Sequence, residues 1–169
     1  MATTITFSNE VKMPIFGLGT WQVCVKNKIQ AYRYFYANEG EIATALRVAL
    51  ENGYRLIDTA TAYQNEAEIG MVLQEFFKAG KLKREGEAEN RSNFCWNRNR
   101  EKDVELLIRQ LLKLFQLDCI DLYLVHMLAG LMRDMSKVDN SIKLEDVWRG
   151  METNGRSSEL TISALKLVV

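Results

Sequence analysis

Residues 54–66, YRLIDTATAYQNE, decide the fold of this chain. The first part, 54–58, is β-prone and ends on a carboxylate, Asp58, as a strand does when it presents a polar group at its C-terminal end. The preceding residues 42–50 carry apolar side chains at helical spacing, and Gly53 follows where a helix commonly stops. The stretch therefore predicts a helix, a turn and a strand, with Tyr63 in the loop after that strand.

The same alternation continues along the chain. Helical spacing of apolar residues recurs in residues 69–76, 104–115 and 144–151. Residues 119–125 are dominated by Ile, Leu, Tyr and Val, which predicts a buried strand, and the polar His126 follows it. Alternating strands and helices favour an α/β fold with a parallel sheet, right-handed crossovers and a ligand site at the carboxyl ends of the strands.

Length and composition suit a single domain. The chain has 169 residues, of which 47% are hydrophobic, so it can bury a core of useful size. The 22 basic and 22 acidic side chains balance, which argues against nucleic acid or an anionic membrane as a partner and favours a small molecule. The N-terminal residues lack the features of a signal peptide and no apolar run approaches the length of a membrane span, so we expect a cytosolic location.

The cysteines do not form a recognisable framework. Cys24, Cys95 and Cys119 lie far apart, which fits neither a set of disulfides nor closely spaced zinc ligands. We therefore expect reduced thiols and no metal site.

Asp58, Tyr63 and His126 supply an acid, a phenol and an imidazole. If parallel strands bring them to one edge of a sheet, they can converge on a carbonyl group and move a proton to it. Each also has a purely structural interpretation: Asp58 as a loop cap, His126 as a residue at the rim of the sheet, and Tyr63 as an aromatic anchor of its loop. Packing in strands is the better explanation for Tyr54 and Tyr123.

Three separated segments resemble the aldo-keto reductase superfamily: residues 13–21 (MPIFGLGTW), 49–70 (ALENGYRLIDTATAYQNEAEIG) and 117–126 (LDCIDLYLVH). The resemblance implies a (β/α)8 barrel preceded by an N-terminal β-hairpin, with NADPH bound without a Rossmann fold. It also implies reduction of aldehydes or ketones, in which Tyr63 protonates the carbonyl oxygen while the nicotinamide supplies hydride.

The resemblance further assigns roles to individual residues. Asp58 and His126 join Tyr63 in catalysis, Gly19, Thr20 and Asp58 lie beside the cofactor, and Trp21 and His126 contact the substrate. In the family, a lysine from the third barrel strand, held by the aspartate, shifts the pKa of the tyrosine toward useful values.

Several parts of the chain depart from the family pattern. Alignment of Trp96 and Asn97 puts Phe94 at the position of the lysine, within a divergent segment at 86–95. Residues 23–36 look like extra sequence, and residues 154–169 look like an atypical tail with no site-like residues. A complete (β/α)8 barrel needs about 250 residues, so we expect a partial domain of about the first four β/α units.

Two hypotheses follow for the function. The first is an NADPH-dependent reductase of a small carbonyl compound. The second is an inactive half barrel, the product of truncation or mis-splicing, that acts as an interaction module and self-associates through an open sheet edge.

Overall fold

The computed structural model describes residues 3–7, 10, 12–21, 40–83, 93–95, 101–125, 138–155 and 163–165. The strands are β1 (Thr4–Thr6), β2 (Lys12–Pro14), β3 (Leu18–Gly19), β4 (Ile57–Ala60), β5 (Asn93–Cys95), β6 (Tyr123–Val125) and β7 (Ser163–Leu165). The helices are α1 (Glu41–Glu51), α2 (Glu66–Lys78), α3 (Glu101–Phe115) and α4 (Leu144–Gly155), together with the 3₁₀ turn η1 (Thr61–Tyr63).

The strands form a hairpin and a parallel sheet. β1 and β2 pair antiparallel, with Ile5 opposite Met13. The second sheet has the order β3-β4-β5-β6-β7, and each neighbouring pair is parallel. The predicted α/β class, parallel sheet and N-terminal hairpin are therefore confirmed. In the described part of the chain the sheet is open, with β3 and β7 at its ends, and no closed barrel forms.

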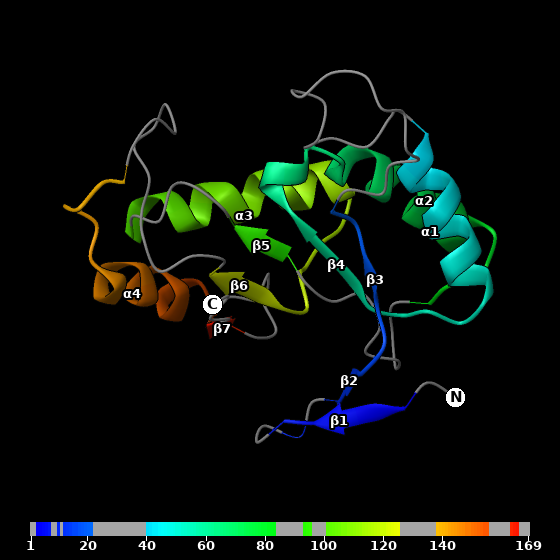
Figure 1. Ribbon diagram of the computed structural model, residues 1–169, viewed down its shortest axis with the longest axis horizontal. Helices are drawn as coiled ribbons and strands as arrows, with labels where there is room; N and C mark the ends of the chain where they lie inside the picture. The colour runs from blue at the N-terminus through cyan, green and yellow to red at the C-terminus, as the bar shows by residue number, and fades with distance from the viewer. Residues whose placement is uncertain are drawn as a thin grey trace, which may run out of the picture.

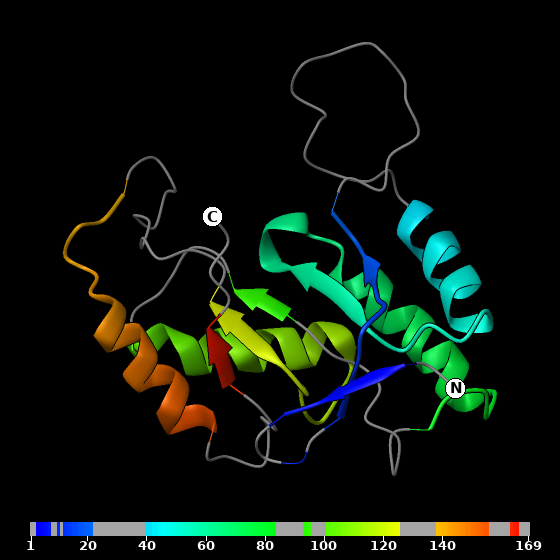
Figure 2. The same ribbon diagram turned by 60° about the horizontal axis from the view of Figure 1, so that its bottom comes forward.

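The helices cover one face of the sheet (Figures 1 and 2). Successive helices contact one another, and their apolar sides form the main core with Ile57, Tyr123 and Val125 of the strands. Side chains alternate between the faces of a strand, so Leu122 and Leu124 belong to a smaller cluster on the other face, with Ala60. The hairpin lies across the end at which the parallel strands begin (Figure 2). Met13 of this hairpin packs against the smaller cluster.

The structure confirms the predicted helices and corrects the strands. The strand predicted at 54–58 runs from Ile57 to Ala60, and the one predicted at 119–125 is limited to Tyr123–Val125. Residues 54–56 instead complete the end of α1, because Arg55 Nη1 donates to the carbonyl of Leu50 at 3.0 Å. A further strand, β7, lies in the segment 154–169 that the sequence presents as a tail, and pairs with β6.

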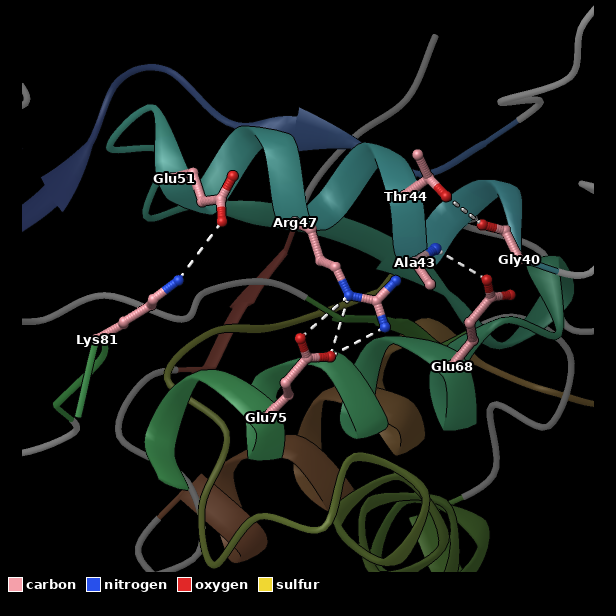
Figure 3. Close-up of polar contacts among 8 residues, drawn as sticks. All are labelled: Gly40, Ala43, Thr44, Arg47, Glu51, Glu68, Glu75 and Lys81. Carbon is pink, nitrogen blue, oxygen red and sulfur yellow. Dashed lines mark hydrogen bonds and ion pairs between the residues drawn. The ribbon is translucent and has the colours of Figure 1, made fainter. Parts of the chain in front are cut away.

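Helix α1 is fastened to α2 by polar contacts (Figure 3). The carboxylate of Glu68 accepts a hydrogen bond from the backbone N–H of Ala43 at 2.8 Å, so a side chain of α2 caps the first turn of α1. Arg47 pairs with Glu75 at 2.9 Å farther along, although both side chains are substantially exposed. Of these two contacts, the one at the N-terminus of α1, which begins just after Gly40, is partly buried, whereas the Arg47–Glu75 pair is exposed.

Helices α2 and α3 pack unusually closely at Gly70. A Cβ atom at this position would lie 2.7 Å from the Cα of Phe115 and would also meet the carbonyl oxygen of Leu114. Glycine is therefore required here by the distance between the two helices. No helix in the described ranges is long and apolar enough to cross a membrane.

Candidate active site

The candidate site lies at the carboxyl ends of β3 and β4, where ligands bind in parallel α/β sheets. Gly19 in β3 is paired with Asp58 in β4, so both lie at the same level of the sheet. Trp21 follows β3 closely, and Tyr63 ends the η1 turn that directly follows β4. The topology therefore places four residues singled out in the sequence, Gly19, Trp21, Asp58 and Tyr63, on two adjacent strand ends.

Thr20 joins these two strand ends. Its backbone N–H donates to the carbonyl of Asp58 at 2.9 Å, and its Oγ1 donates to the same oxygen at 3.1 Å. Thr20 is almost completely buried. Its hydroxyl therefore holds the end of β3 against the end of β4.

Trp21 and Tyr63 form a stacked aromatic pair. Their ring centroids are 6.3 Å apart and the ring planes differ by 16°. Trp21 is 56% exposed, whereas Tyr63 is partly buried and packs against the small cluster of Ala60, Leu122 and Leu124. The pair thus presents the tryptophan to solvent and places the phenol ring beside the face of the sheet that the helices leave uncovered.

The surroundings of Tyr63 favour its protonated form. Partial burial raises the pKa of the phenol above its ordinary value of 10.0, and the negative charge of Asp58 raises this pKa further. A phenol with a raised pKa stays neutral at physiological pH and donates a hydrogen bond. Asp58 is close enough to influence Tyr63, but its charge acts against ionisation of the phenol.

The third strand of the sheet provides no lysine beside this pair. β5 consists of Asn93, Phe94 and Cys95, and the backbone of Phe94 pairs with Ala60 on one side and Leu124 on the other. The departure from the family pattern expected at Phe94 therefore lies within a strand that borders β4. Within the described part of the chain, the pKa of Tyr63 is shifted by two causes, its partial burial and the charge of Asp58, and both raise this pKa.

Two buried polar residues behind the loop received no role from the sequence. Asn65 Nδ2 donates to the carbonyl of Thr20 at 3.1 Å, and Asn65 Oδ1 accepts from Thr59 Oγ1 at 3.0 Å. Glu66, the first residue of α2, is 3% exposed. Burial raises the pKa of its carboxyl to about 7, although a hydrogen bond from its own backbone N–H lowers it.

A sequence signal for these two residues exists but is ambiguous. An Asn followed by a Glu just before an apolar periodic segment is typical of a helix start. Asn65 does occupy the N-cap position of α2, but its side chain makes no capping hydrogen bond. The amide is used in contacts to Thr20 and Thr59, which are distant from a helix cap and can be found only in three dimensions.

His126 and the extra segment 23–36 lie outside the described residues, so their predicted roles stay predictions. Among the described residues, no group of three or more His, Cys, Asp or Glu side chains could hold a metal ion.

Comparison with known proteins gives a consistent result. The model of the Aldo/keto reductase family matches residues 16–156. Aldo-keto reductase family 1 member A1 of Cricetulus griseus is 36% identical over 126 residues, which cover 75% of this chain and 35% of that protein. NADP-dependent D-sorbitol-6-phosphate dehydrogenase of Malus domestica is 32% identical over 163 residues, which cover 89% of this chain and 47% of that protein.

Solved structures agree with the sequence comparisons. A Bombyx mori aldo-keto reductase crystallised with NADP superposes with a TM-score of 0.81 at 29% identity, covering 97% of this chain and 50% of that one. An aldo-keto reductase complexed with NADPH superposes with a TM-score of 0.80 at 27% identity, covering 98% of this chain and 47% of that one. The chain therefore spans half or less of the length of these relatives.

Proposed function

Because this chain belongs to the Aldo/keto reductase family, we propose that it reduces a small aldehyde or ketone with NADPH and that Tyr63 donates the proton. The observation that carries the proposal is the position of Tyr63, which follows the carboxyl end of β4, stacks on the ring of Trp21 and is influenced by the charge of Asp58. Strand ends of a parallel sheet are the usual place for such a site.

Tyr63 would bind the carbonyl oxygen through its phenolic hydrogen. The oxygen gains negative charge as the carbonyl carbon is reduced, and a neutral hydrogen-bond donor at that oxygen would stabilise the charge. The proton then moves from the phenol to the oxygen, which leaves a phenolate beside Asp58. Since Asp58 is negatively charged, it opposes this step, so proton transfer by Tyr63 is expected to be slow in this chain.

The residues around β3 are compatible with a nicotinamide cofactor, which supplies hydride when bound. No atom of the described part of the chain lies within 4 Å of where a Cβ on Gly19 would be, so these residues leave the backbone there open to a ligand. Thr20 is less suited to a direct contact, because its N–H, hydroxyl and carbonyl already take part in hydrogen bonds within the protein. We therefore assign the cofactor contact to Gly19 and Asp58, and a clamping role to Thr20.

Trp21 is proposed as a wall of the substrate pocket. Its ring is exposed on one side and stacked on Tyr63 on the other, so a bound carbonyl compound could pack against it while reaching the phenol. His126 is proposed as a second donor to the carbonyl oxygen. We also propose that the protein is located in the cytosol.

Steady-state reduction of a generic aldehyde by NADPH tests the assignment. Tyr63→Phe removes only the hydroxyl, so we expect kcat to fall to background while the KM for NADPH changes little. Tyr54→Phe is the matched control, because Tyr54 is an exposed tyrosine that precedes β4. If Tyr63→Phe retained the activity of the unaltered protein, Tyr63 would not be the proton donor.

A second candidate function is a non-catalytic module that self-associates. The observation that favours it is the open sheet, in which β3 and β7 are end strands within the described ranges. Light scattering over a concentration series would then reveal association, together with no turnover of NADPH. A monodisperse active monomer would exclude this alternative.

A further inference from the structure

We infer that Asn65 is a positioning residue: its side-chain amide holds the Trp21–Tyr63 pair in place by joining the loop after β3 to the strand that carries Asp58. The inference rests on the proposed function only in naming Tyr63 as the proton donor. The geometric part depends on hydrogen bonds and ring contacts alone.

The amide of Asn65 uses both of its ends. Nδ2 donates to the carbonyl of Thr20 at 3.1 Å, and Oδ1 accepts from the hydroxyl of Thr59 at 3.0 Å. The opposite orientation of the amide would place its oxygen against the carbonyl of Thr20, where no donor is available. The Thr20 carbonyl, which can only accept, therefore fixes which end of the amide faces it, and the Thr59 hydroxyl satisfies the amide oxygen at the other end.

These contacts are sheltered from water. Asn65 is 6% exposed, and Thr20 and Thr59 are each 1% exposed. Loss of one partner in a buried network leaves the other polar group unsatisfied, which costs more than loss of an exposed hydrogen bond. These buried hydrogen bonds therefore constrain the loop after β3 more strongly than the same hydrogen bonds would at an exposed site.

The hydrogen bonds of Asn65 act on the backbone next to each of the two aromatic residues. The Thr20 carbonyl belongs to the peptide group that leads into Trp21, so a bond to this carbonyl fixes the direction in which Trp21 leaves β3. Tyr63 is two residues before Asn65, and the intervening Gln64 has a left-handed backbone with φ of 54°. Asn65 thereby anchors the Trp21 side directly and the Tyr63 side through a short, sharply turned segment.

The Thr20 clamp completes the arrangement. Thr20 binds the Asp58 carbonyl through both N–H and Oγ1, while Thr59, the neighbour of Asp58, donates to the amide oxygen of Asn65. The two strand ends and the start of α2 are thus joined through one amide. A change at Asn65 should disturb the position of Trp21 over Tyr63 before it disturbs the main core, to which Asn65 does not belong.

Fluorescence of Trp21 provides the first test. In a chain with Trp96→Phe and Trp148→Phe, Trp21 is the only tryptophan, and acrylamide quenching reports how well Tyr63 covers it. We expect Asn65→Ala to increase quenching toward the value of the unfolded chain. Thr59→Val removes only the hydroxyl that donates to the amide oxygen of Asn65, and is expected to produce a smaller increase in a protein that remains folded.

Titration of Tyr63 provides the second test. The absorbance difference between each variant and the same variant carrying Tyr63→Phe isolates this phenol from the other tyrosines. Asn65→Ala and Thr59→Val add no charge, so a loosened pair should lower the pKa of Tyr63 toward its ordinary value of 10.0. A purely structural role would not move this titration in a folded variant.

Val147→Ala is the matched control, because Val147 is a buried core residue of α4. It should lower global stability and leave both the Trp21 quenching and the Tyr63 titration unchanged. The inference is overturned if Thr59→Val, while folded, leaves both readouts unchanged, or if Val147→Ala alters them equally. Neither readout requires NADPH, so failure of the proposed function would not be mistaken for failure of this inference.

Discussion

Replacement of Glu66 by Gln should stabilise the protein, and the gain should depend on pH. Glu66 is 3% exposed at the first position of α2, and its Oε1 atom has no hydrogen-bond partner within the described structure. A negative charge at a helix N-terminus is normally favourable. Here burial outweighs that benefit, because the pKa of the carboxyl is raised from 4.5 to about 7.

The magnitude follows from the two pKa values. The difference between 4.5 in the unfolded chain and about 7 in the folded protein corresponds to about 3 kcal/mol. Between these values the folded protein binds the proton more tightly than the unfolded chain, so the free energy of unfolding falls as pH rises. The cost of the charge is absent below about pH 4.5 and complete above about pH 7.

Urea unfolding monitored by circular dichroism at several pH values measures this effect. Glu66→Gln should match the unaltered protein near pH 4.5 and exceed it by up to about 3 kcal/mol above pH 7. Glu145→Gln is the control, because Glu145 is an exposed glutamate in the first turn of α4 and experiences a similar helix field. A constant difference between Glu66→Gln and the unaltered protein at all pH values would show that the buried charge of Glu66 is not the cause.

Three other substitutions have distinct expected results. Gly70→Ala should lower the free energy of unfolding by about 1–3 kcal/mol, because its Cβ would collide with the backbone of Phe115. Glu68→Ala should cost about 1 kcal/mol through loss of the cap on α1, whereas Glu68→Gln keeps an acceptor and should cost less. Phe94→Lys should lower the pKa of Tyr63 by adding a positive charge on β5, and should accelerate NADPH-dependent reduction of an aldehyde.

Each of these has its own control. Gly19→Ala should leave stability little changed, because no atom among the described residues lies within 4 Å of the added Cβ. An equal loss at Gly19 and Gly70 would show that close packing is not the cause of the loss at Gly70. Equal losses for the two Glu68 variants would show that the side-chain oxygen does not cap α1. Phe94→Met adds no charge, so acceleration by Met as well as Lys would remove the electrostatic explanation.

The helices were predictable because their signal is local. The apolar spacing of residues 42–50 and 69–76 corresponds to the sides of α1 and α2 that enter the core. The two helices are correct in position and differ only in their ends. The parallel sheet followed from their alternation with strands.

The strands were less predictable because their limits depend on distant residues. Tyr54 and Arg55 have the composition of a strand, yet Arg55 donates to the carbonyl of Leu50 and completes the end of α1. β7 exists through pairing with β6, and its Ser163–Leu165 sequence contains no repeated pattern long enough to predict it. Three-residue strands contribute too few positions for alternation to be detected.

The candidate site shows the same division. Asp58, Tyr63 and Trp21 could be identified from the motif, and the structure places them on two adjacent strand ends. The raised pKa of Tyr63 could not be predicted, since it results from burial beside Ala60, Leu122 and Leu124 and from the nearby charge of Asp58. The Asn65 amide bridge likewise depends on residues far apart in the sequence.

Titration of the chain with NADPH is the most direct test that these strand ends form a cofactor and carbonyl site. Trp21 would serve as the reporter in the chain with Trp96→Phe and Trp148→Phe, because it lies beside Gly19 and is stacked on Tyr63. If the cofactor binds at these strand ends, Trp21 fluorescence should change saturably as NADPH is added. A folded sample with no saturable change in either Trp21 or NADPH fluorescence would contradict this prediction.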